Sequence, residues 1–180
     1  MEGEKRNIIM CGFMATGKTS VGRKLAALIG FDFLDLDTLI ETEACMSIPE
    51  IFSSQGEPAF RALESHTIEQ LGSRSRCVIA AGGGAIVNPQ NLANLKRIGV
   101  VITLTADPQT ILSRVGSGED RPMLKGGDKI ERIRTLMEQR AQSYAQADII
   151  IDTSSLNIDE VASRIRDVLR EFISSLGGSQ

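Results

Sequence analysis

The chain has 180 residues, 42% of them hydrophobic and 24% charged, and a formal net charge of −3. This length fits one domain, so residues 1–180 are predicted to fold as a single unit. The balance of charge lacks the basic excess that nucleic-acid or anionic-membrane binding requires, so we expect neither partner. The three cysteines form no CxxC pair and no apolar run is long enough to span a bilayer, which indicates a cytoplasmic protein.

Short apolar runs alternate with longer segments of helical period, a pattern typical of βαβ units around a mostly parallel sheet. Strands are predicted at 7–11, 33–35, 77–81, 100–105 and 148–152. Helices are predicted at 18–29, 57–72, 108–115, 129–145 and 158–176. The predicted fold class is therefore α/β, a parallel sheet flanked by helices.

Two regions depart from this alternation, and each lies where doubly wound enzymes place their working parts. Residues 37–64 are predicted to be mostly helical, with Ser47 as an N-cap and Pro49 in the first turn of a helix. Residues 116–128 are rich in glycine and charge and poor in apolar side chains. That composition predicts a lid that closes over a ligand.

A phosphate-binding motif follows the first predicted strand. Gly12 to Thr19 read GFMATGKT, which matches the pattern GxxxxGK[ST] between a strand and a helix. Glycines let backbone amides point at phosphate oxygens, and the following helix adds the positive end of its dipole. Lys18 can reach the β and γ phosphates, and the Thr19 hydroxyl can ligate Mg²⁺. The motif predicts binding of a nucleoside triphosphate.

A pair of carboxylates follows the second predicted strand. Asp35 and Asp37 are separated by one residue, and alternation along an extended chain would put both on one face. The alternative interpretation is two solvated loop acids, because acidic residues are common at strand ends. Their position beyond the carboxyl end of a strand, where doubly wound folds bind ligands, favours a functional pair beside Mg²⁺.

The phosphate loop and the acid pair, taken with further motifs, resemble those of the shikimate kinase family. DLDTLIE follows the GFMATGKTSVGR loop, residues 56–64 resemble the family's GExxFRxxE segment, and residues 82–84 resemble its glycine triplet. RPML at 121–124 resembles the lid sequence RPLL, and Arg140 with Tyr144 resembles the RxxxY segment. The matches cover roughly residues 7–153 in the family's order. They imply a P-loop fold like that of nucleoside monophosphate kinases, with a five-stranded parallel sheet, a substrate-binding region at about 37–64 and a lid at about 116–128.

The resemblance also implies a reaction. It is the ATP-dependent phosphorylation of the 3-hydroxyl of shikimate, giving 3-phosphoshikimate and ADP on the route to chorismate and the aromatic amino acids. Thr19 and Asp35 would hold Mg²⁺, Asp35 through a water, while Lys18 would stabilise the transferring group. Asp37 would bind the accepting hydroxyl and is a candidate general base. A monomer with shikimate and ATP as its small-molecule partners is expected.

The acceptor site implied by the resemblance binds a carboxylate. Arg61 and Arg140 would clamp it with planar guanidinium groups, and the amides of Gly83 and Gly84 would complete the pocket. Each arginine also has an ordinary interpretation, because solvated helix faces and weak ion pairs are common. The glycines could equally be a tight turn.

The nucleotide site implied by the resemblance includes two more arginines. Arg121 would move onto the ATP phosphates as the lid closes, and Arg114 would stack on adenine. The implied catalytic residues are thus Lys18, Asp37 and Arg121. The implied ATP-binding residues are Gly12, Ala15, Thr16, Gly17, Lys18, Thr19, Ser20, Arg114 and Arg121. Ala15 and Thr16 depart from the family's usual small residues, and residues 152–156 lack the arginine and proline of some relatives, which puts adenine contacts there in doubt.

Two rival functions remain open from the sequence. A gluconate-type kinase would share the phosphate loop and the lid but not the paired arginines. A nucleotide-dependent switch protein would need neither a base such as Asp37 nor a phosphate-capping Arg121. His66, the only histidine, belongs to no recognisable constellation and receives no role.

Overall fold

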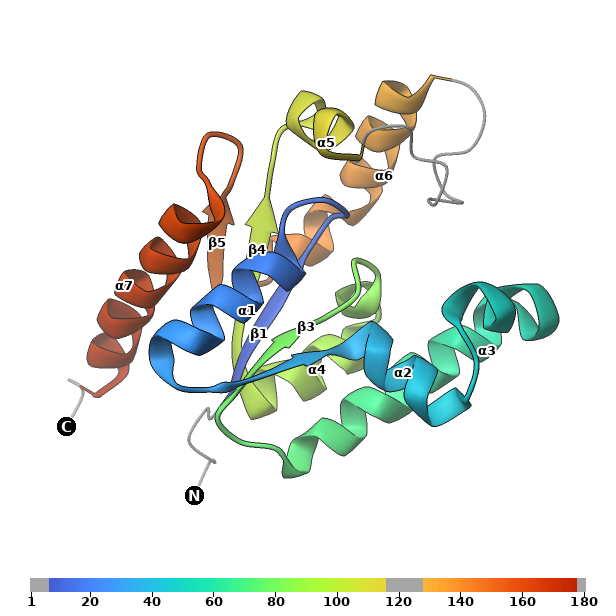
Figure 1. Cartoon of the computed structure of the whole chain (residues 1–180), viewed down its shortest axis with the longest axis horizontal. Coiled ribbons are helices and arrows are strands. Elements are labelled where there is room, and N and C mark those ends of the chain that lie inside the picture. Colours follow the sequence, from blue (N-terminus) through green and yellow to red (C-terminus); the bar gives the residue numbers. More distant parts are fainter. Residues whose placement is uncertain (1–6, 116–127, 178–180) are drawn as a thin grey trace.

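The computed structural model of the chain describes residues 7–115 and 128–177, with side chains as far as residue 174. Its centre is a five-stranded sheet in the order β2-β3-β1-β4-β5 (Figure 1), and every pair of neighbours is parallel. The strands are β1 Asn7–Gly12, β2 Asp32–Asp35, β3 Cys77–Ala80, β4 Gly99–Thr105 and β5 Ile149–Asp152. All five predicted strands are confirmed, with bounds that agree to within about one residue.

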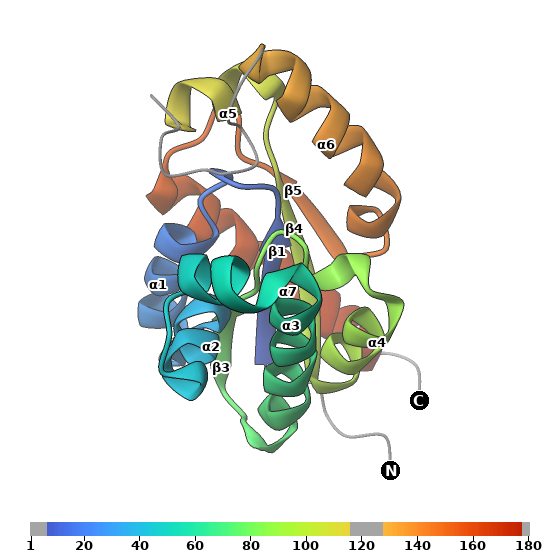
Figure 2. The same cartoon turned by 90° about the vertical axis from the view of Figure 1, so that its right-hand side faces the viewer.

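Helices cover both faces of this sheet (Figure 2). They are α1 Lys18–Ile29, α2 Leu36–Ala44, α3 Ile48–Gln70, α4 Pro89–Ile98, α5 Pro108–Val115, α6 Lys129–Tyr144 and α7 Ile158–Gly177, with short 3₁₀ turns η1 Leu71–Ser73 and η2 Ala85–Val87. One core cluster joins α1 and α7 to the sheet, and the other joins α3, α4 and α6 to its opposite face. No helix in these described stretches is both long and apolar enough to cross a membrane.

The central strand shows why the pattern of the sequence predicts this sheet. Ile8 and Met10 belong to the cluster beneath α1 and α7, whereas Ile9 and Cys11 belong to the cluster on the other face. All six residues of β1 are buried. A strand buried on both sides must be apolar at every position rather than at alternate ones, which explains the run IIMC.

The helices agree with the predictions in most places. α1 and α5 have the predicted bounds, and α6 and α7 differ from theirs at one end only, by about one residue. The Ser47 side chain accepts from the Glu50 amide and the Glu50 carboxylate accepts from the Ser47 amide, a capping box that confirms the predicted N-cap.

Two features differ from the predicted elements, and one prediction lies outside the described residues. Region 37–64 is mostly helical, as predicted, but the helix predicted at 57–72 is the second part of α3, which begins at Ile48, ends at Gln70 and is kinked at Gly56, where φ is +82°. Helix α4 is not predicted, although Asn88 caps it and Pro89 opens it, because its two asparagines weaken the helical pattern. Residues 116–127 of the predicted lid lie outside the described residues.

The strand order brings three loops together at one edge of the sheet. β1 lies between β3 and β4, and β3 lies between β1 and β2. Because the strands are parallel, the segments that follow β1, β2 and β3 leave the sheet at the same edge. These segments are the phosphate loop, the Asp35–Asp37 pair and the glycine triplet.

Candidate active site

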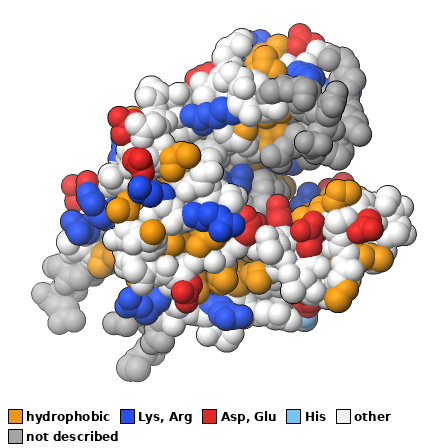
Figure 3. Space-filling model, in the orientation of Figure 1, with side chains coloured by type: hydrophobic (Ala, Val, Ile, Leu, Met, Phe, Trp, Pro, Cys, Tyr) orange, Lys and Arg blue, Asp and Glu red, His pale blue; other side chains and the backbone are white. Residues whose placement is uncertain are grey.

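A cavity of about 470 Å³ opens at this edge of the sheet. Figure 3 shows the hollow between the part of the molecule that carries α5 and α6 and the part that carries α2 and α3, with charged side chains at its rim. Its lining includes these predicted site residues: Ala15, Gly17, Lys18, Thr19, Ser20, Asp35, Asp37, Arg61, Gly83, Gly84 and Arg140. The fold therefore gathers side chains from both halves of the sequence around one volume.

The phosphate loop connects β1 to α1 at the floor of the cavity. Gly17 is the N-cap of α1 with φ +96°, and no side chain caps the helix there, so its first amides are available to an anion. Thr16 is buried, and its hydroxyl donates to the Phe13 carbonyl at 2.8 Å. The Lys18 ammonium donates to the same carbonyl at 2.9 Å. The loop is thus held from within by bonds between its own residues.

Gly12 lies behind the loop rather than in the cavity. It ends β1 with φ +134°, and a Cβ there would collide with the backbone carbonyl of Leu104 on the neighbouring strand. Gly12 and Thr16 therefore shape the loop from its buried side, whereas Gly17, Lys18 and Thr19 face the cavity.

Ala15 carries backbone strain within the loop. Its φ is +59°, in the left-handed region where a Cβ costs about 1 to 2 kcal/mol. Replacing Ala15 with glycine removes that cost, although glycine adds entropy to the unfolded chain. We expect Ala15→Gly to raise the free energy of unfolding by on the order of 1 kcal/mol. Urea unfolding followed by circular dichroism measures the change, and Ala26→Gly, in the middle of α1, should destabilise the protein instead. A loss of stability in Ala15→Gly would contradict the strain.

The Asp35–Asp37 pair reaches the cavity by a geometry different from the predicted one. β2 ends at Asp35, which is the N-cap of α2 and accepts from the Asp37 amide at 3.2 Å. Asp37 lies in the first turn of α2, so extended alternation does not align the two acids, and that part of the prediction is wrong. The helix starts here, and the strand does not continue, because the Asp35 carboxylate accepts a hydrogen bond from an amide that the helix leaves unpaired. Both acids still line the cavity.

The oxygen atoms near the loop suit a magnesium ion. The Thr19 hydroxyl donates to Asp35 Oδ2 at 3.0 Å, so a hydroxyl and a carboxylate converge beside the phosphate loop. Mg²⁺ is usually held by one or two such groups together with water and substrate phosphates, rather than by a cage of protein ligands. Accordingly, no group of three or more His, Cys, Asp and Glu with metal-binding geometry occurs in the described residues. The donor set fits Mg²⁺ bound with a nucleotide.

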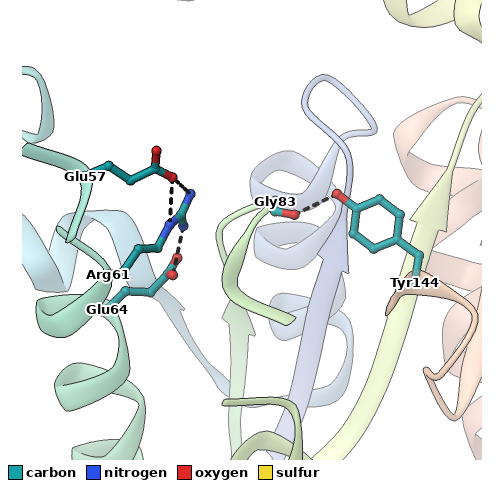
Figure 4. Close-up of polar contacts among 5 residues, drawn as sticks. All are labelled: Glu57, Arg61, Glu64, Gly83 and Tyr144. Atoms are coloured by element: carbon teal, nitrogen blue, oxygen red, sulfur yellow. Dashed lines mark hydrogen bonds and ion pairs between the residues drawn. The ribbon is translucent and has the colours of Figure 1, made fainter. Parts of the chain in front are cut away.

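Arg61 lies on α3 between two glutamates (Figure 4). Its Nη1 donates to Glu64 at 2.9 Å and its Nη2 donates to Glu57 at 3.1 Å. Glu64 is only 1% exposed, and burial raises its pKa while the nearby Arg61 opposes that rise. The ordinary ion pairs considered for Arg61 therefore exist, but one of them is buried at the cavity wall and orients the guanidinium.

The glycine triplet allows charged side chains to approach the backbone closely. A Cβ on Gly84 would lie 2.8 Å from Arg61 Nη1, and one on Gly83 would lie 3.4 Å from Arg140 Nη1. A Cβ on Gly82 would lie 3.2 Å from Asp37 Oδ1. Arg61, Arg140 and Asp37 thus all lie against this loop, whereas a tight turn alone would need no charged side chains around it.

Tyr144 fixes the triplet from the other side. Its hydroxyl donates to the Gly83 carbonyl at 2.7 Å (Figure 4). The ring is buried, which raises the pKa of the phenol against the opposing effect of Arg140. Arg140 also lies over the ring of Phe13, with its Cζ 5.8 Å from the ring centroid. One face of α6 therefore contacts both the triplet and the phosphate loop.

The remaining wall of the cavity is apolar. Ile48, Phe52 and Phe60 project from α3, and the two phenylalanine rings lie 4.8 Å apart. A ligand in this cavity would meet a hydrophobic surface on one side and charged groups on the other, an arrangement that suits a small ring with a carboxylate and hydroxyl groups.

Other predicted residues lie beside the cavity or beyond the described residues. Arg114, at the end of α5, donates to the Ala15 carbonyl at 3.4 Å and thus touches the phosphate loop from outside. Arg121 lies outside the described residues. The site predictions did not include Glu64, Tyr144 and Thr153. The first two stand within the GExxFRxxE and RxxxY segments, and Thr153 lies in segment 152–156, where the departure from some relatives put adenine contacts in doubt.

Comparisons with known proteins identify the relatives of this site. The sequence model of the family described as shikimate kinase matches residues 14–170. The chain belongs to the shikimate kinase family. The shikimate kinase of Geobacter metallireducens is 44% identical over 164 residues, which cover 91% of this chain and 92% of that protein.

Solved structures place the fold in the same family. The shikimate kinase of Acinetobacter baumannii, in complex with shikimate, superposes with a TM-score of 0.87 at 35% identity, covering 92% of this chain and 93% of that one. A gluconokinase from Sinorhizobium meliloti superposes with a TM-score of 0.61 at 15% identity, covering 96% of this chain and 95% of that one, and shares the fold alone. As in other shikimate kinases, this fold is a P-loop kinase fold, which confirms the predicted class.

Proposed function

We propose that this chain transfers the γ-phosphoryl group of ATP to the 3-hydroxyl of shikimate through the cavity at the edge of its sheet. The activity is that of the shikimate kinase family, to which the chain belongs. One observation carries the assignment of roles: Lys18, Asp37 and the two arginines Arg61 and Arg140 line the same cavity. The cavity therefore contains a phosphate site and a carboxylate site, and the Asp37 carboxylate in the same cavity can bind a hydroxyl group.

The phosphates of ATP lie on the phosphate loop in this proposal. The first amides of α1 and the loop backbone donate to phosphate oxygens, and Gly17 supplies the left-handed conformation that the turn requires. Lys18 moves from the Phe13 carbonyl to the β and γ phosphates and stabilises charge on the transferring group. Ser20 lines the same end of the cavity. Arg121 caps the phosphates when the lid, residues 116–128, closes.

Thr19 and Asp35 are the residues proposed to hold Mg²⁺, Thr19 directly and Asp35 through a water. When bound with ATP, the ion neutralises charge on the β and γ phosphates. The task of the protein is to keep both oxygen donors in place, which Asp35 does by also capping α2 through the Asp37 amide.

Asp37 is proposed to bind the accepting 3-hydroxyl and to take its proton. Its position in the first turn of α2 fixes the backbone, and its carboxylate lies against Gly82 at the cavity wall. Because phosphoryl transfer proceeds through a loose transition state, orientation of the hydroxyl contributes more than early removal of its proton. Asp37 therefore positions the hydroxyl first and accepts the proton late.

The shikimate carboxylate is proposed to lie between Arg61 and Arg140. Two guanidinium groups present paired donors to one carboxylate, and the backbone amides of Gly83 and Gly84 add donors from the triplet. The ring of shikimate then packs against Phe52 and the rest of the apolar wall. Residues 37–64 supply most of this substrate-binding region.

We propose further that the chain acts as a single-domain monomer in the cytoplasm. The phosphate loop, the acid pair and both arginines of the cavity all come from this chain. All three cysteines are free, which is typical of proteins from reducing compartments.

The deciding experiment is an ADP-release assay with a panel of acceptors. We expect ADP release with shikimate and Mg²⁺, none above background with gluconate, and at least about a thirtyfold lower kcat/KM with the methyl ester of shikimate, which lacks the carboxylate charge. Mass spectrometry should identify 3-phosphoshikimate as the product. Phosphorylation of gluconate but not shikimate would overturn the proposal in favour of the rival kinase.

A further inference from the structure

Thr153, directly after β5, is a buried hydroxyl that connects three parts of the fold. The residue is 2% exposed. Its Oγ1 lies 2.9 Å from the Thr105 carbonyl at the end of β4 and 3.3 Å from the Thr16 carbonyl of the phosphate loop. The same oxygen accepts from Arg114 Nη1 at 3.0 Å. A hydroxyl has one proton and two lone pairs, so it can donate to one carbonyl while it accepts from the arginine.

Arg114 is hydrogen-bonded through the edge of its guanidinium group. Besides the bond to the Thr153 hydroxyl, its Nη2 donates to the Thr153 carbonyl at 2.7 Å and its Nη1 donates to the Ala15 carbonyl at 3.4 Å. The N–H groups of a guanidinium lie in its plane, so these bonds fix the orientation of that plane. The side chain is nevertheless exposed overall. A guanidinium bonded through its edge and exposed to solvent has a face on which a planar ring can stack.

We infer that Thr153 is a positioning residue for the nucleotide. It holds the Arg114 guanidinium beside the phosphate loop, in an orientation that allows a nucleobase to stack on it. The inference rests on the proposed function in one respect, namely that ATP lies on the phosphate loop. Thr153 does not contact the base in this inference; it acts through Arg114. Without the Thr153 hydroxyl, Arg114 keeps its bond to the Thr153 carbonyl and the longer bond to the Ala15 carbonyl, and loses the 3.0 Å bond that helps to fix the plane of the guanidinium.

The test compares three variants of the whole enzyme. Thr153→Val keeps the shape of the side chain and removes the hydroxyl, and we expect it to raise the KM for ATP about tenfold while the KM for shikimate changes less than about twofold. Thr153→Ser keeps the hydroxyl and should restore the KM for ATP. Thr103→Val is the matched control, because Thr103 is also buried and bonds the Tyr144 carbonyl at 3.2 Å, remote from Arg114. It should lower Tm without changing the KM for ATP.

A double-mutant cycle shows whether Thr153 acts through Arg114. If it does, Arg114→Ala raises the KM for ATP, and adding Thr153→Val to Arg114→Ala causes little further change. Multiplicative effects of the two substitutions would overturn the inference and indicate that Thr153 acts through the Thr16 carbonyl instead. An unchanged KM for ATP in Thr153→Val would overturn it outright.

Binding of ADP, measured by calorimetry without acceptor, separates this inference from the proposed function. About tenfold weaker ADP binding in Thr153→Val, with recovery in Thr153→Ser, supports the inference whichever acceptor the enzyme phosphorylates. Failure of the wild type to release ADP with shikimate would contradict the proposed acceptor alone. Unchanged ADP binding in Thr153→Val contradicts the inference alone.

Discussion

Replacing Lys18 with alanine should lower kcat for shikimate phosphorylation by about a thousandfold while leaving the fold intact. Lys18 directly follows Gly17 of the phosphate loop. No other described cation that lines the cavity can replace it, because Arg61 and Arg140 lie at the acceptor end. The Thr16 hydroxyl also donates to the Phe13 carbonyl, so this carbonyl keeps a partner when the ammonium is removed, and we expect the fold to persist. The main contribution of the ammonium should come when charge develops on the transferring phosphoryl group.

Lys24 offers a matched control on the same helix. It is exposed and pairs with Asp159 of α7 at 2.7 Å, and it does not line the cavity. We expect Lys24→Ala to keep normal turnover, because exposed ion pairs contribute little. Steady-state ADP release gives kcat, and circular dichroism melting confirms folding. A Lys18→Ala enzyme that folds normally and turns over within tenfold of the wild type would refute the role of Lys18.

Replacing Arg140 with alanine should weaken shikimate binding by about 2 to 5 kcal/mol, or at least roughly thirtyfold, with ADP binding nearly unchanged. The guanidinium lies at the glycine triplet, on the acceptor side of the cavity. Calorimetry is the appropriate measurement, because the chain has no tryptophan to report binding by fluorescence. Arg134→Ala, an exposed position on the same helix, should bind shikimate normally.

The methyl ester of shikimate makes this prediction sharper. If Arg140 binds the carboxylate, the wild type should prefer shikimate strongly over its ester, and Arg140→Ala should lose most of that preference. Equal weakening of shikimate and ADP would instead indicate that the substitution disturbs the whole site.

Arg61 requires a different design, because Glu64 depends on it. Glu64 is buried, and Arg61 is the partner that offsets the cost of its charge. Arg61→Ala alone would leave that carboxylate buried without its ion pair and destabilise the fold. Arg61→Ala combined with Glu64→Gln removes both charges, so any remaining loss of shikimate affinity can be assigned to the clamp.

Much of this protein could be predicted from local sequence. The apolar run IIMC predicts a strand, and GFMATGKT predicts a phosphate loop, because strand preference and loop conformation depend on neighbouring residues. Ser47 followed by Pro49 predicts a helix start for the same reason, and the structure adds the capping box between Ser47 and Glu50. The order of the family's motifs then indicated Asp37, Arg61 and Arg140 as site residues.

The limits of local reasoning appear at Asp35. In an extended chain the side chains of Asp35 and Asp37 would point to the same face. Asp35 instead caps α2, so the direction of the Asp37 side chain is set by the first turn of that helix. Sequence period could not choose between strand and helix here, because β2 ends at Asp35 and α2 begins at the next residue, Leu36. The hydrogen bond from the Asp37 amide to the Asp35 carboxylate favours the start of the helix.

The sequence by itself determined the strands, most of the helices, the phosphate loop and, through its motifs, the residues of the site. Only the tertiary structure decided which of them meet. The strand order β2-β3-β1-β4-β5 brings the loops after β1, β2 and β3 to one edge, and it places Arg61 and Arg140 on either side of the glycine triplet. Tertiary packing also buries Glu64, the neighbour of Arg61 on α3, and brings Thr153 beside Arg114. Burial and contact between distant segments depend on how whole elements pack, and no periodicity within a segment records that packing.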